Sequence, residues 1–177
     1  MAKKGFLYET QISAKDNDAL NRFAVASADI DGGTLVSLGA VAHGDVFTAT
    51  KATDGTGGGL WMAYNPEEHL TKVGDNLFAG LTADPRDYTN IADRTFDVFK
   101  PVAGVDIVGF TAGNIKAGET VEVGKFLEVG ANGLEVKASA TANTTSFEVI
   151  KIEKVPFPQA GIGAEYADKY VCAVAFN

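Results

Sequence analysis

The chain has 177 residues, of which 46% are hydrophobic, and its 23 acidic and 15 basic side chains give a formal net charge of −8. A chain of this length forms one domain or two small lobes and buries roughly 70% of its unfolded surface, so it needs no disulfide to hold a core. The acidic balance argues against generic binding to nucleic acid or to an anionic membrane, because phosphate groups would be repelled.

Residues 1–26 show no sustained helical or strand periodicity, so we expect an N-terminal arm with a short strand. The basic residues at the start have no apolar stretch behind them, which excludes a secretory signal and predicts folding in a cytoplasm. No segment approaches the ~18 consecutive apolar residues of a membrane-spanning helix.

The middle of the chain alternates short apolar segments with turn signals. Strands are predicted at 35–39, at 46–50 and at 60–66, with a flexible glycine-rich loop at 53–59. Pro66 and the acidic residues after it favour a helical turn at the start of the segment 65–81, which Gly74 would end. The polar segment 83–95 is predicted to be a long loop.

The strand signal is stronger in the second half of the chain. Residues 124–141, "GKFLEVGANGLEVKASAT", predict a β-hairpin in which Asn132-Gly133 tolerates the positive φ that its tip requires. In "TSFEVIKIEKV", Phe147 and Val149 share one parity and Ile150 and Ile152 the other, which predicts a bulge or a strand buried on both sides. "KYVCAVAFN" is expected to be the closing strand.

Short strands at intervals of roughly eight to twelve residues indicate a mainly β protein, with antiparallel strands in a sandwich or small barrel. At most one or two short helices are expected. The arm at 1–26 would precede a β-rich domain at 27–177, and if this domain has two lobes their boundary falls near 100–118.

The reactive residue types form no recognisable catalytic, cofactor or metal site. Cys172 lies in an apolar segment and is predicted to be a small buried hydrophobe, while His43 and His69 are expected to be solvated loop residues. Leu60 and Trp61 follow the glycine-rich loop, where a phosphate-binding loop requires Lys and Ser or Thr. Calcium-loop spacing is absent as well. We therefore predict that the protein is not an enzyme, although composition alone leaves open a carboxylate pair for sugar hydrolysis.

Several segments, taken in order, resemble one family of tailed-phage head proteins, the capsid decoration or cement proteins. They are "GTLVSLG", "GDVFTAT", "LWMAYNPEEHL", "GDNLFAGLTADPRDYTNIADRTFDVFKP", "VEVGKFLEVGANGLEVKAS", "FEVIKIEKV" and "YVCAVAF". The similarity covers most of the chain from about residue 32. Where the family would have Gly-Asp-Ile, this sequence has "GVDIVGF".

The resemblance implies a virion structural protein that binds the outer surface of the phage capsid and stabilises contacts between major capsid protein subunits. It implies assembly as a homo-oligomer on the capsid, no cofactor, and neither nucleic acid nor membrane as partner. We expect Phe6, Leu7 and Tyr8 of the N-terminal arm to contact a partner chain.

Two other functions stay open from the residues. A phage tail-tube or baseplate subunit is the first, and tube subunits usually carry a long hairpin that completes a neighbour's sheet. The predicted hairpin at 124–138 is short, which disfavours this function. The second is an enzyme or sugar-binding β-domain, which would require a carboxylate cluster in a cleft.

Overall fold

The computed structural model describes residues 3–80, 82–159 and 163–177, and it confirms a mainly β fold. Four short 3₁₀ helices lie among the described residues: η1 (Ser13–Asp16), η2 (Asp18–Leu20), η3 (Pro85–Asp87) and η4 (Ala112–Asn114). The strands are β1 (Leu7–Gln11), β2 (Asn21–Val25), β3 (Leu35–His43), β4 (Val46–Lys51), β5 (Trp61–Ala63), β6 (Leu70–Val73), β7 (Asn76–Ala79), β8 (Thr95–Phe99), β9 (Ile107–Phe110), β10 (Phe126–Gly130), β11 (Gly133–Lys137), β12 (Ser146–Gln159) and β13 (Gly163–Phe176).

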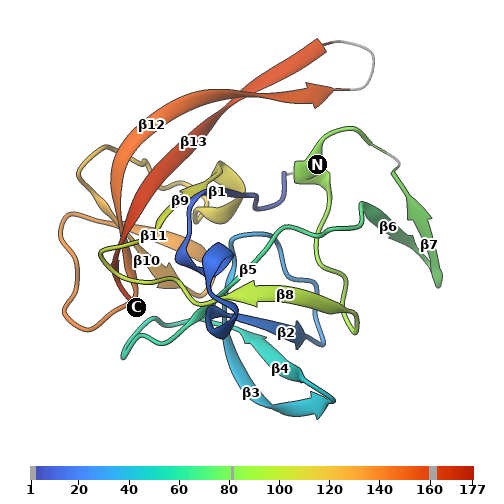
Figure 1. Ribbon diagram of the computed structural model, residues 1–177. Helices are drawn as coiled ribbons and strands as arrows, with labels where there is room; N and C mark the ends of the chain where they lie inside the picture. The colour runs from blue at the N-terminus through green and yellow to red at the C-terminus, as the bar shows by residue number, and fades with distance from the viewer. Residues whose placement is uncertain (1–2, 81, 160–162) are drawn as a thin grey trace.

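The described strands form two main sheets (Figure 1). Five strands close a barrel in the order β2-β4-β3-β5-β8, and six form a sheet in the order β1-β9-β13-β12-β10-β11. Within the barrel, β2 and β4 are parallel, whereas the other neighbouring strands are antiparallel. A separate two-stranded sheet, β6-β7, lies apart from the barrel and the six-stranded sheet.

Two apolar cores follow from the alternation of side chains along the strands. The barrel interior holds mostly small residues, among them Ala24, Val36, Ala63 and Val98, because a five-stranded barrel has little room inside. The next residue along a strand points the other way, so Phe99, which follows Val98, points out of the barrel and belongs to the second core. This larger core contains Leu7, Leu35, Met62, Phe99, Val108, Phe110, Leu127, Phe147 and Cys172, and so draws on both sheets.

Two local predictions are confirmed. β10 and β11 form the hairpin expected at 124–141, with Gly130 opposite Gly133 and a φ of 116° at Gly133. The expected bulge in β12 is present between Val149 and Lys151. Val149 on one side of it is fully buried, while Ile150 is 43% exposed.

Two other predictions require correction. The segment 65–81 has no helical turn among its described residues, because β6 and β7 pair there and Gly74 occupies their turn with a φ of 61°; Leu81 lies outside the described residues. Residues 7–26 are not a free arm, since β1 pairs with β9 and β2 belongs to the barrel. Residues 1 and 2 of that expected arm lie outside the described residues.

Replacing Phe110 by Ala is expected to lower the free energy of unfolding by about 3–5 kcal/mol, because the ring is fully buried and meets Phe147 edge-on at 5.2 Å. Urea unfolding followed by circular dichroism measures this loss. The matched control is Phe78→Ala, which removes a ring that is 45% exposed and should cost less than about 0.5 kcal/mol. Equal losses in the two variants would show that the layer between the sheets is not the main core.

Candidate interaction site: the projecting hairpin and its anchor

The longest strands of the protein extend beyond the sheet that contains them. β12 pairs with β10 only through Ser146–Glu148, and β13 pairs with β9 only through Tyr170–Ala173. Beyond these contacts, residues 150–159 of β12 have no strand partner but residues 163–171 of β13 among the described residues. Residues 163–169 of β13 likewise pair only with β12. Residues 150–159 and 163–169 leave the body of the molecule (Figure 1). We call these two segments the projecting hairpin. A two-stranded ribbon is marginally stable in water by itself, so this one requires an anchor.

The anchor is Phe157, which is only 2% exposed although it lies near the end of β12. The guanidinium carbon of Arg86 lies 3.8 Å from the centre of its ring, a close cation–π contact. Phe6 meets the same ring edge-on at 5.8 Å, and the ring of Tyr8 lies 6.0 Å away. Gly109 makes room for this packing, because a Cβ there would lie 2.8 Å from the Cβ of Tyr8.

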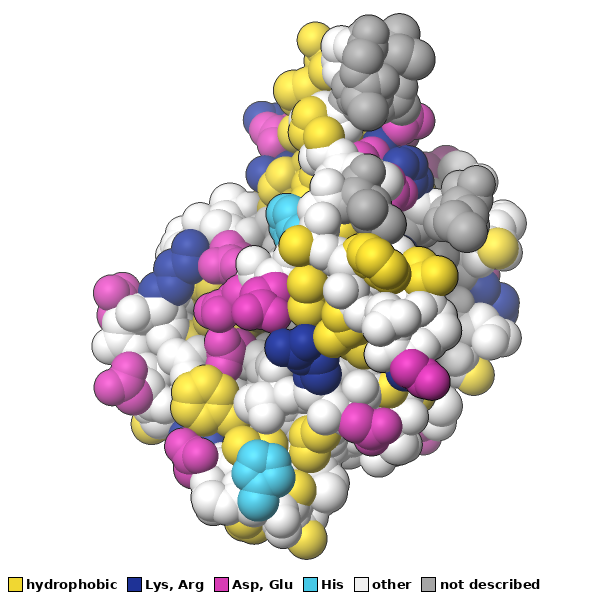
Figure 2. Space-filling view, turned by 90° about the vertical axis from the view of Figure 1, so that its right-hand side faces the viewer, with side chains coloured by type: hydrophobic (Ala, Val, Ile, Leu, Met, Phe, Trp, Pro, Cys, Tyr) yellow, Lys and Arg dark blue, Asp and Glu magenta, His cyan; other side chains and the backbone are white. Residues whose placement is uncertain are grey.

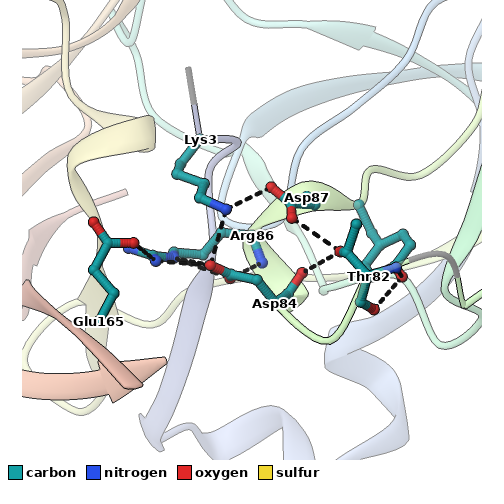
Figure 3. Close-up of polar contacts among 7 residues, drawn as sticks. Lys3, Thr82, Asp84, Arg86, Asp87 and Glu165 are labelled. Carbon is teal, nitrogen blue, oxygen red and sulfur yellow. Dashed lines mark hydrogen bonds and ion pairs between the residues drawn. The ribbon is translucent and has the colours of Figure 1, made fainter. Parts of the chain in front are cut away.

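Charged side chains tie three separate segments together at this anchor (Figure 3). Arg86 Nη2 lies 2.7 Å from the Asp84 carboxylate and 2.6 Å from the carboxylate of Glu165 on the projecting hairpin. Lys3 Nζ lies 3.0 Å from Asp84 and 2.7 Å from Asp87. The N-terminal segment, the 82–88 loop and the hairpin therefore meet in one ion-pair network.

The 82–88 loop has the sequence features needed to present Arg86. Asp84 caps η3, where its carboxylate accepts a hydrogen bond of 2.9 Å from the Arg86 backbone N–H. Pro85 follows at the first helical position, where its fixed φ suits the turn. Tyr88 closes the loop: it is 1% exposed, its hydroxyl accepts from the Thr82 N–H at 2.9 Å, and its ring stacks on His69 at 4.5 Å.

The network keeps its members charged. Burial alone would raise the pKa of Asp84, but hydrogen bonds from the Arg86 side chain and backbone and from Lys3 outweigh it and lower this pKa to about 2. The pKa of Arg86 is raised, chiefly by its hydrogen bond to Asp84. Asp84 and Arg86 are therefore ionised at neutral pH, which suits a structural clamp and does not suit proton transfer.

The projecting hairpin exposes several apolar side chains among its charged ones. Tyr166 is 67% exposed and lies opposite Pro156, which is also exposed. Ile152 is 36% exposed and Ile150, at the bulge, 43%. Exposed apolar side chains on a projecting element are typical of a surface that contacts another protein.

The structure gives the residues predicted to bind a partner a different environment. Leu7 is 1% exposed and belongs to the core between the sheets. Phe6 and Tyr8 are partly buried and pack against Phe157. Leu7 is thus buried in this fold and Phe6 and Tyr8 partly so, and contact of these three residues with a partner chain stays a prediction.

Sequence reasoning missed the anchor and the length of the hairpin. The strand predicted in "TSFEVIKIEKV" ended at Val155, yet β12 runs on through Pro156 and Pro158, because proline is tolerated in a strand that has a free edge. Phe157 between two prolines, and Asp-Pro-Arg at 84–86, were the available signals. Neither segment indicates that the other is its partner.

Other candidate chemistry is sparse in the described part of the chain. Cys172 is fully buried as predicted, and burial raises the pKa of its thiol, which opposes formation of a thiolate. Across residues 3–80, 82–159 and 163–177, no three histidine, cysteine or acidic side chains are grouped to hold a metal ion. None of the described helices is long and apolar enough to span a membrane.

No protein-family model matches the sequence, and no curated protein is significantly similar to it.

Replacing Asp84 by Asn is expected to lower the free energy of unfolding at pH 7 by about 2–4 kcal/mol, because Arg86 keeps its charge and loses a buried partner. Since the pKa of Asp84 is lowered to about 2 on folding, the stability it contributes is complete above its ordinary value of about 3.9. That contribution is lost as the pH falls towards 2. Urea unfolding at several pH values should show the two proteins converging below about pH 4.

The control for this pH dependence is Asp16→Asn, which neutralises an exposed aspartate away from the network. It should change the stability by less than about 0.5 kcal/mol. A constant difference between the parent protein and Asp84→Asn from pH 7 to pH 3 would contradict an ionised Asp84.

Replacing Arg86 by Lys is expected to loosen the projecting hairpin, because an ammonium group retains the charge and loses both the forked contact with Asp84 and the flat stacking on Phe157. Hydrogen exchange should become at least about tenfold faster in the amides of Val155 and Phe157, with β8 unchanged. The control Lys154→Gln removes only the exposed 2.8 Å pair with Asp168 and should leave exchange unaltered. Unchanged exchange in Arg86→Lys would show that the strand ladder alone holds the hairpin.

Proposed function

We propose that the protein is a virion structural component, without catalytic activity, that binds the outer surface of a phage capsid and stabilises contacts between major capsid protein subunits. The projecting hairpin is the observation that best supports this function. It is anchored at Phe157 and Arg86, and its side chains of Ile152 and Tyr166 are exposed. The sequence resemblance to capsid decoration proteins supplies the identity of the partner.

A bridging protein stabilises a shell by adding contact area that must be lost before neighbouring subunits separate. Because it binds the assembled shell and not free subunits, it shifts the equilibrium towards the assembled form by mass action. Each capsomer repeats the binding site, so adjacent copies act at high effective concentration. The net charge of −8 also disfavours binding to the packaged genome.

A second candidate, a tail-tube or baseplate subunit, is favoured by the length of β12 and β13. Each strand has 14 residues, whereas the hairpin of β10 and β11 has strands of 5. The short hairpin was the reason to disfavour a tube subunit, and β12 and β13 remove that reason. Both candidates use the projecting hairpin as the contacting element, and they differ in the partner.

Mixing the purified protein with undecorated expanded heads and, separately, with tails distinguishes the two candidates. We expect it to sediment with heads in a saturable manner, because the outer lattice of the shell repeats the site. Sedimentation with tails alone would replace the first candidate by the second. Binding to neither would contradict both.

The double substitution Ile152→Ser and Tyr166→Ser is expected to weaken head binding at least about tenfold, because it removes exposed apolar contact area from the hairpin. The control Val123→Ser changes a side chain that is 59% exposed outside the hairpin and should retain full binding. Deletion of residues 2–12 is a poor alternative, since it removes β1 and the buried Leu7. Equal occupancy for all variants would exclude the hairpin as the contact.

A further inference from the structure

Two hollows meet on the outside of the barrel, and they share two residues, Phe23 and Asp97. The first has a volume of about 310 Å³ and is bounded by the segments 65–70 and 89–97. The second, of about 610 Å³, lies towards the turn between β3 and β4. We call the two together the barrel hollow. It is separate from the projecting hairpin, which lines neither part.

The pairing of β2 with β8 explains why Phe23 and Asp97 lie together. They are direct partners across these antiparallel strands, so their side chains emerge on the same face. Their neighbours Ala24 and Val98 point into the barrel, which places Phe23 and Asp97 on the outside. Phe23 is 46% exposed, so its ring is accessible to a bound side chain.

The barrel hollow is strongly acidic. Five carboxylates and two guanidinium groups line it: Asp18, Asp45, Glu67, Glu68 and Asp97, with Arg22 and Arg94. Acidic side chains gather in the middle of the face seen in Figure 2, beside exposed hydrophobic ones. Aromatic rings of Phe23, Phe47 and Tyr64 contribute the apolar part of the lining.

Both guanidinium groups are already engaged. Arg94 lies 3.2 Å from Glu68, and Arg22 donates to the Asn21 carbonyl oxygen at 2.6 Å while its guanidinium lies over the Trp61 ring. Among the described residues, no group donates a hydrogen bond to the Asp97 carboxylate and no cation pairs with it. Burial raises the pKa of Asp97, and the nearby charge of Glu67 raises it further. The hollow therefore contains a partly desolvated carboxylate without a counter-charge.

We propose that the barrel hollow binds a lysine or arginine side chain presented by an exposed segment of a partner protein. The cation would pair with Asp97 and Glu67, and its position beside Phe23 adds a cation–π contact and covers the exposed ring. The aliphatic part of the same side chain fits against Phe47. A phosphate-bearing partner does not fit, because the carboxylates repel it. The proposal does not depend on capsid binding.

A short peptide tests this without knowledge of the partner. The probe is acetyl-Gly-Arg-Arg-Gly-amide, titrated to millimolar concentration into the ¹⁵N-labelled full chain and followed by two-dimensional NMR. We expect saturable amide shifts confined to β2, β8 and the segment 65–68. The acidic peptide acetyl-Gly-Glu-Glu-Gly-amide should produce none.

The double variant Glu67→Gln and Asp97→Asn should weaken peptide binding at least about tenfold, the loss expected for a paired, partly desolvated cation. The control Glu122→Gln and Glu148→Gln changes the net charge by the same amount at exposed carboxylates elsewhere and should bind like the parent. Circular dichroism confirms that each variant is folded.

Three results would overturn the proposal. They are shifts spread over the whole acidic surface, equal weakening in both double variants, and the same local shifts caused by dilution of the protein alone. The last result would assign the hollow to a second copy of the chain. A fourth result, saturation of the same amides by micromolar calcium, would also overturn the proposal and would assign the hollow to a metal ion.

Discussion

The apolar layer between the barrel and the six-stranded sheet is the contact on which the rest of the structure depends. The barrel alone encloses mostly alanine and valine, which is too little apolar volume to stabilise five short strands. Its outward-facing Met62 and Phe99 are buried in the core that they share with Phe110 and Phe147 of the sheet. The two sheets are thus halves of one folding unit, and neither is expected to persist without the other.

The side chains of Asn65 and Asn114 form hydrogen bonds at the edge of this layer. Asn65, just after β5, donates to and accepts from the backbone of Leu7 at 2.7 and 2.9 Å, so it acts as a short strand along the free edge of β1. Asn114 bonds the backbones of Phe6 and Gly32 in the same way. These hydrogen bonds hold β1 and Phe6 in position, so that Phe6 and Tyr8 pack against Phe157. The anchor of the projecting hairpin therefore depends on Asn65 and Asn114.

Sequence patterns within short segments predicted the local features of this fold. The β10-β11 hairpin and the bulge after Val149 follow from alternation and glycine chemistry within about ten residues. The helical turn expected near Pro66 failed because β6 and β7 pair across Gly74. Of the interaction site, only Phe6, Leu7 and Tyr8 were singled out from the sequence, and they were expected to contact a partner chain. Arg86 and Phe157 were not found, because these two residues lie far apart in the chain.

The sequence by itself determined a β-rich, acidic chain with a buried cysteine and many short strands, because composition and alternation depend only on adjacent residues. Only the tertiary structure decided that β12 and β13 continue beyond the sheet, that Arg86 pairs with Asp84 and with Glu165 of the hairpin, and that Phe23 meets Asp97 outside the barrel. The physical reason is that each of these features is a pairing between distant segments. Strand registers set these pairings, and registers follow from how the whole apolar surface is buried.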